Sequence, residues 1–168
     1  MTTRRTWLAS GLGAWVLGSS IRGVQAAPPP RAEPWGILGP DSVALIRARH
    51  AGRPLVVHLW GMTCGPCLAE LPKWGALRRR RPDMNLVLIQ VDQAPPRAGR
   101  QTLQAAGLQG VESWSVGSEL DEFLRASIDP KWRGDMPRTL LISSGGEITR
   151  IAGVADLGRV ERWLDGTP

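Results

Sequence analysis

The two cysteines of this chain are separated by only two residues, and their position constrains the fold more than any other feature. Cys64 and Cys67 lie between a short apolar run at 55–60 and a segment of helical pattern that continues to about Arg80. Residues i and i+3 in a first helical turn have Cα atoms about 5–6 Å apart, which is within the range that a disulfide requires. The spacing therefore predicts a disulfide that opens and closes at a strand–helix junction without rearranging the backbone.

The residues between the cysteines suit thiol chemistry. Gly65 allows another chain to approach closely, and Pro66 lacks the N–H that a helix start would leave unpaired. Cys64 would lie at the positive end of the helix dipole, which stabilises a thiolate and lowers its pKa. We therefore expect Cys64 to be the exposed nucleophile and Cys67, one turn further in, to be the shielded resolving thiol.

Two other uses of the cysteine pair are weaker. A structural disulfide that closes a four-residue loop would constrain the unfolded state little. A metal site would need further ligands, and the candidates are His50 and His58, of which His58 lies in an apolar run where a core histidine is the commoner case. We predict a redox pair with no metal. We also expect no bound cofactor, because the dithiol itself carries the electrons.

The remaining hydrophobic pattern alternates strands with helices. This order predicts an α/β domain whose central sheet has parallel strands and an antiparallel edge. The expected helices are at about 43–50, 64–80, 97–106, 118–127 and 156–164, and the expected strands are at 55–60, 85–91, 139–142 and 147–152.

The N-terminal segment reads as an export signal. Arg4 and Arg5 precede a moderately apolar stretch, and Val24-Gln25-Ala26 is a small-x-small cleavage pattern. We expect a signal peptide at 1–26, of twin-arginine or ordinary secretory type, then a Pro-rich linker at 27–35 and one domain at 36–168. Export predicts a periplasmic location, with an uncleaved membrane anchor as the alternative.

Charge and composition exclude several classes of protein. The net charge of +6 falls to +3 once residues 1–26, with three arginines and no acid, are removed, and this is weak evidence for nucleic-acid binding. Two cysteines exclude a multi-disulfide scaffold, and 42% hydrophobic residues exclude overall disorder. The basic run 78–81 precedes Pro82, so it predicts a solvated helix end, with a docking patch for an acidic partner as the alternative.

The residues Trp60–Cys67 resemble the active-site strand and turn of the thioredoxin superfamily, and the resemblance covers about 38–168. Pro72 resembles the proline that kinks the active-site helix there. Met136 and Pro137 resemble its cis-proline loop, which would lie beside the disulfide and pair with an extended substrate segment. The resemblance implies a thioredoxin-like fold, with a central mixed sheet flanked by helices and a helical insert before this loop.

The export segment, the run CLAELP at 67–72 and the insert most resemble the TlpA/ResA-like branch. Glu70 matches an active-site glutamate of that branch, which implies a role in tuning the thiol pKa and in proton transfer; a solvent-facing glutamate is the alternative. His58 stands where many thioredoxins have a buried acid, so it would accept the proton of the resolving thiol or be a hydrogen-bonded core residue. Thr63 departs from the usual aromatic residue before the first cysteine.

These features predict an exported thiol–disulfide oxidoreductase that reduces disulfides of envelope proteins, with cytochrome c maturation as one process that it would serve. Such a reductase needs a membrane electron donor, such as a DsbD-type protein. The alternatives are an envelope oxidase or isomerase, a copper metallochaperone of thioredoxin fold, and a non-catalytic binding module. Trp114 and Trp132 are expected either to line a substrate groove or to pack the insert on the sheet.

Overall fold

The computed structural model describes residues 35–166 of the 168-residue chain. The predicted signal peptide at 1–26 and all of the predicted linker except Trp35 lie outside the described residues. The domain expected at 36–168 therefore begins, as described here, with a strand at Trp35.

A six-stranded sheet forms the centre of the described part, in the order β1-β4-β3-β2-β5-β6. The first four of these strands run parallel, and β5 and β6 are antiparallel to their neighbours, as predicted for a mixed sheet. The bounds are β1 Trp35–Leu38, β2 Leu55–Trp60, β3 Asn85–Gln90, β4 Glu112–Val116, β5 Arg138–Ile142 and β6 Ile148–Ala152.

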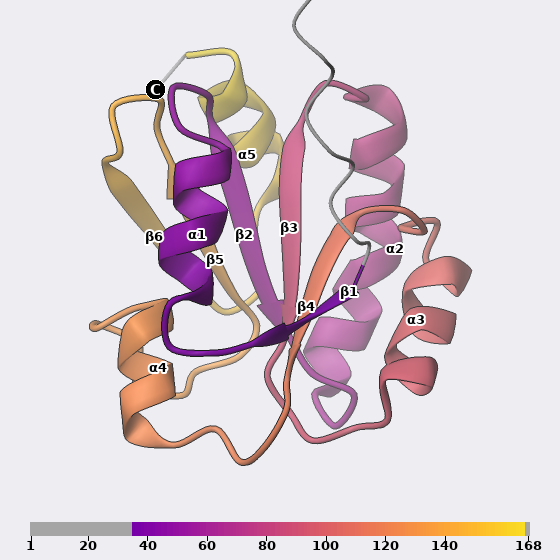
Figure 1. Cartoon of the computed structure of the whole chain (residues 1–168). Coiled ribbons are helices and arrows are strands. Elements are labelled where there is room, and N and C mark those ends of the chain that lie inside the picture. The colour runs from indigo at the N-terminus through magenta and orange to yellow at the C-terminus, as the bar shows by residue number, and fades with distance from the viewer. Residues whose placement is uncertain (1–34, 167–168) are drawn as a thin grey trace, which may run out of the picture. The chain divides into compact units, whose positions relative to one another are not determined.

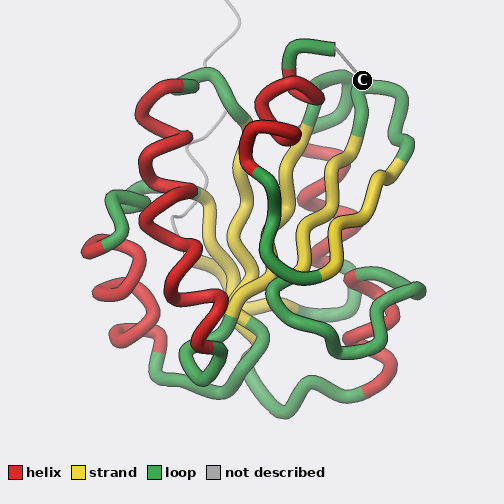
Figure 2. The backbone as a smooth tube through the Cα atoms, turned by 180° about the vertical axis from the view of Figure 1, so that it is seen from behind, coloured by secondary structure: helices red, strands yellow, loops and turns green. Residues whose placement is uncertain are grey.

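Helices cover both faces of this sheet (Figures 1 and 2). The side chains of α2, α3 and α5 pack into the core on one face, and those of α1 and α4 pack into the core on the other. The helices are α1 Ser42–Arg49, α2 Gly65–Arg80, α3 Pro96–Ala105, α4 Glu122–Ile128 and α5 Leu157–Leu164. The predicted thioredoxin-like architecture, with α4 as the helical insert between β4 and β5, is confirmed.

Strand β2 is buried along its whole length because it lies between these two layers. Alternate residues of a strand point to opposite faces. Val56 and Trp60 accordingly contribute to the core under α2, while Leu55, Val57 and Leu59 contribute to the core under α1 and α4. The apolar run that predicted a doubly covered strand is thereby explained.

Two strands were not predicted. Strand β4 was missed because two of its three buried positions, Ser113 and Ser115, are polar. The Ser113 hydroxyl donates to the carbonyl oxygen of Val111, and the Ser115 hydroxyl accepts from the Trp35 indole, so both hydroxyls are satisfied inside the protein. Strand β1 was missed because Trp35 was assigned to the linker.

The idea that two tryptophans line a substrate groove is wrong for Trp132. Its side chain is 1% exposed in the core under α4, and its indole N–H donates to the carbonyl oxygen of Asp135. Trp114 lies in β4, packs against the same core and donates to Glu112. Both residues therefore fulfil the packing alternative.

Candidate active site at the start of helix α2

The two cysteines form a disulfide at the N-terminus of α2. The Cα atoms are 5.2 Å apart, within the range expected from the spacing of the motif. Cys64 is the N-cap residue, and its sulfur accepts a hydrogen bond of 3.2 Å from the backbone N–H of Cys67. Cys64 is partly exposed and Cys67 is fully buried, so only the first sulfur is open to an attacking or attacked partner.

The turn before Cys64 is held by a carboxylate from the neighbouring strand. Asp92 follows β3, and its Oδ2 accepts from both the backbone N–H and the hydroxyl of Thr63, at 2.8 and 3.1 Å. Gln90 donates to the other oxygen of the same carboxylate. Sequence reasoning missed Asp92, although an acid directly after β3 lies at the same sheet edge as the residues that follow β2.

The Met136–Pro137 peptide bond is cis, as predicted. Arg138 pairs with Leu59 across the β2–β5 ladder, so the start of β5 lies beside the end of β2, which leads to the disulfide. The carbonyl oxygen of Pro137 accepts from the N–H of Gly153 at 2.8 Å. The geometry thus brings the cis-proline loop and the cysteine turn to the same edge of the sheet.

His58 is completely buried in β2. One ring nitrogen, Nδ1, lies 3.0 Å from the hydroxyl oxygen of Thr139, while Nε2 has no hydrogen-bond partner among the described residues. Burial lowers the pKa of the imidazole to about 3, because the charged form would be desolvated. His58 is therefore neutral near pH 7, and the same burial that keeps it neutral makes it a weak base.

Glu70 is also buried, with 1% of its surface exposed, and does not face solvent. Its Oε1 accepts from the backbone N–H of Ala155 at 2.9 Å, and Oε2 has no hydrogen-bond partner among the described residues. Burial raises the pKa of this carboxyl, although the Ala155 N–H, the Trp74 indole and the Lys73 charge act in the opposite direction.

Trp74 connects these two titratable residues. Its ring centroid lies 4.9 Å from that of His58, and its indole is close enough to Glu70 to affect the pKa of the carboxyl. Trp74 and Cys67 belong to the same core cluster, which lies between α2 and the sheet. Two buried titratable groups therefore lie close to Trp74, on the same side of the protein interior as Cys67.

The other candidate residues have local roles. Gly65 and Pro66 are exposed between the cysteines, and Pro72 lies inside α2. Within the basic run, Arg80 pairs with Glu161 and Arg81 with Asp165, so these arginines tie the end of α2 to α5. Within residues 35–166, no group of three or more His, Cys, Asp or Glu side chains is arranged to hold a metal ion.

No family model matches the chain. Solved structures do match it. A secreted Mycobacterium tuberculosis disulfide oxidoreductase homologous to E. coli DsbE is 18% identical, with a TM-score of 0.57 over 71% of this chain and 85% of the other. The fold is that of thioredoxin. A DsbF homologue from Corynebacterium diphtheriae (15% identity, TM-score 0.60, 71% and 75% covered) and StoA from Bacillus subtilis (19%, 0.53, 67% and 83%) share it.

Within the thioredoxin fold, the disulfide and the cis-proline are at the predicted residues. Glu70 is buried, so the solvent-facing alternative for it is wrong. Identities below 20% establish the fold alone, so the chemistry rests on the geometry above. In the described part of the chain, no helix is both long enough and apolar enough to cross a membrane.

Proposed function

We propose that this protein is an exported thiol–disulfide oxidoreductase that reduces disulfides of envelope proteins in the periplasm. The observation that carries the proposal is the unequal burial of the two sulfurs at the N-terminus of α2: Cys64 is partly exposed and Cys67 is not exposed at all. One sulfur is thereby open to a substrate, and the second is held within reach to complete the exchange.

The reaction begins from the reduced pair. The Cys64 thiolate, favoured by the free N–H groups of the helix start, attacks one sulfur of a substrate disulfide. A mixed disulfide forms, and the other substrate sulfur leaves as a thiol after taking a proton. Cys67 then loses its proton, attacks Cys64 and releases the second substrate thiol. The substrate gains two electrons and two protons, and the disulfide of the structure is formed.

Of the two candidates for the proton that Cys67 must lose, Glu70 is the better suited, because its raised pKa lies closer to that of a thiol. His58 is the weaker acceptor, because a pKa of about 3 makes its imidazole a poor base. Gly65, Pro66 and the backbone at Met136 and Pro137 would form the surface on which an extended substrate segment lies.

Two observations support the compartment and the direction. The N-terminal sequence has the pattern of an export signal, and one of the matching solved structures is of a secreted protein. The Gly-Pro dipeptide between the cysteines is that of thioredoxin, whose potential of about −270 mV is far more reducing than that of DsbA at about −120 mV. A membrane donor such as a DsbD-type protein would return the electrons, and maturation of cytochrome c is one process that needs such a reductase.

The reduction potential of the Cys64–Cys67 pair, measured by equilibration with glutathione, tests the direction. We expect a value near that of thioredoxin, and a value above about −180 mV would overturn the reductase assignment in favour of an oxidase or isomerase. Redox function itself is tested by alkylation after mild reduction. Cys64 should be modified first, and failure to modify either sulfur would contradict the mechanism.

A further inference from the structure

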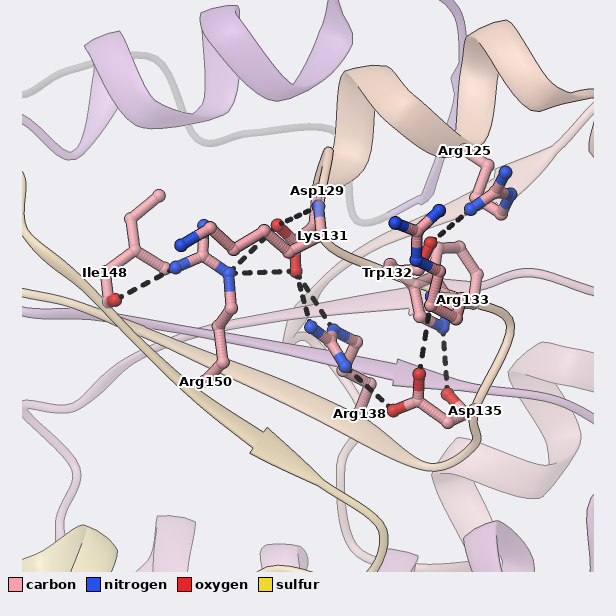
Figure 3. Close-up of polar contacts among 9 residues, drawn as sticks. All are labelled: Arg125, Asp129, Lys131, Trp132, Arg133, Asp135, Arg138, Ile148 and Arg150. Atoms are coloured by element: carbon pink, nitrogen blue, oxygen red, sulfur yellow. Dashed lines mark hydrogen bonds and ion pairs between the residues drawn. The ribbon is translucent and has the colours of Figure 1, made fainter.

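A buried ion-pair network lies next to the cis-proline loop and takes no part in the chemistry above (Figure 3). Its centre is Asp129, which follows α4 and has a side chain that is 1% exposed. Oδ2 of Asp129 accepts from Nε and Nη2 of Arg138, at 3.0 and 2.8 Å. Nε of Arg150, in β6, lies 3.0 and 3.1 Å from the two oxygens of the same carboxylate.

Arg138 joins the two ends of the loop that leads to the cis-proline. Besides its contacts with Asp129, it donates from Nη1 to Oδ2 of Asp135 at 2.8 Å. Its side chain is only 6% exposed, so it does not itself meet a substrate. The planar guanidinium presents its donors in a fixed fork, and one side chain therefore sets the separation of two carboxylates six residues apart in sequence.

The loop between these carboxylates is further closed on itself. The backbone N–H of Lys131 donates to Oδ1 of Asp129, and the indole of buried Trp132 donates to the carbonyl oxygen of Asp135. Arg125, in α4, donates to the carbonyl oxygen of Trp132. The segment 129–135 is thus held from α4, β5 and β6 together, and the next residues along the chain are Met136 and Pro137.

We propose that Arg138 is a positioning residue for protein substrates. By holding Asp129 and Asp135, it fixes the backbone at Met136, against which an extended segment of a disulfide-bonded protein lies beside Cys64. This inference rests on the proposed function and names the feature that would distinguish protein disulfides from small ones. A small disulfide needs only the exposed sulfur of Cys64. A polypeptide also needs the backbone at Met136 and Pro137, which we call the substrate platform.

Stability alone does not explain the network. Replacing a buried ion pair by apolar side chains of similar size is often neutral or stabilising, so four charged groups are a poor way to hold a loop if packing is the only requirement. What the Arg138 fork supplies is one defined geometry, and a shift of about 1 Å in a positioning group can cost about a hundredfold in rate.

The test compares two substrates in variants of the full chain. We expect Arg138→Met to lower kcat/KM about tenfold or more for a disulfide-bonded peptide, mainly through KM, while the rate with oxidised glutathione and the reduction potential stay unchanged. Arg138→Lys should recover only part of the peptide activity, because an ammonium group lacks the fork. Arg80→Met, which removes the exposed pair with Glu161, is the matched control and should leave both substrates unaffected.

Each outcome decides the matter. Equal losses with both substrates would show a merely structural role and overturn the inference, as would full peptide activity in Arg138→Met. If that variant does not fold, Asp135→Asn takes its place, because it leaves the Asp129 pair intact and Asp135 is 37% exposed. Unchanged peptide KM in Asp135→Asn would then overturn the inference. A wild-type protein inactive with both substrates would instead contradict the proposed function.

Discussion

Replacing His58 by leucine should make the protein lose less stability in acid than the wild type does. The folded protein holds this imidazole neutral down to a pKa of about 3, whereas the unfolded chain protonates it below its ordinary pKa of 6.5. Between these values the unfolded state binds more protons, so the free energy of unfolding falls as the pH falls. From about pH 7 to about pH 4.5 this single group accounts for a loss of about 2–3 kcal/mol, which His58→Leu removes.

The assay is denaturant unfolding of the disulfide-bonded protein at both pH values, for the wild type and for His58→Leu. Contributions from carboxylates are common to both proteins and cancel in the difference between the two losses. Thr139→Val is the matched control, because it removes the hydroxyl beside Nδ1 but keeps the imidazole, and it should retain the wild-type loss. If His58→Leu loses as much stability in acid as the wild type, the imidazole is not held neutral by burial and the reasoning is refuted.

Three further predictions concern two residues of α2, Glu70 and Gly75. Because burial raises the pKa of Glu70, the fold favours its neutral form, and Glu70→Gln should be more stable than the wild type above the ordinary carboxyl pKa and no more stable below it. The same variant should slow thiol–disulfide exchange by about a hundredfold if Glu70 transfers protons, as stopped-flow measurement would show; an unchanged rate would exclude that role. Gly75→Ala should lower the free energy of unfolding by about 2 kcal/mol, because the added Cβ overlaps the carbonyl oxygen of Ala106 and this outweighs the gain of about 1 kcal/mol in helix propensity. Thermal unfolding at or above the wild-type midpoint would contradict that contact.

The parts of the site that were predictable are those built from neighbouring residues. The cysteine pair, the helix that it opens and the strand before it form one continuous stretch of about 25 residues, 55–80, in which hydrophobic period and spacing carry the information. The cis-proline was also predicted, because Met136 and Pro137 resemble the cis-proline loop of the thioredoxin superfamily and X–Pro is the peptide bond in which cis costs little.

What escaped prediction depends on pairs that are distant in sequence. Ser115 is buried because its hydroxyl meets the indole of Trp35, 80 residues earlier, so one buried face of β4 carries serines and reads as polar. Asp92 reaches Thr63 only because β2 and β3 end at the same edge of the sheet. A hydropathy pattern does not record contacts between residues so far apart in the sequence. It also predicts that a charged residue such as Arg138 is exposed, although its counter-ions allow it to be buried.

Three consecutive residues of the β6–α5 loop hold two parts of the site at once, since the N–H of Gly153 meets Pro137 and that of Ala155 meets Glu70. Inserting or deleting a single residue there would displace the substrate platform and the buried acid in the same event. The hairpin turn at 143–146 joins β5 to β6 at the edge of the sheet away from the disulfide, and it holds no part of the site. Affinity tags, fluorophores or grafted binding loops therefore belong at that turn, and the loop of Gly153 and Ala155 should keep its length in any redesign.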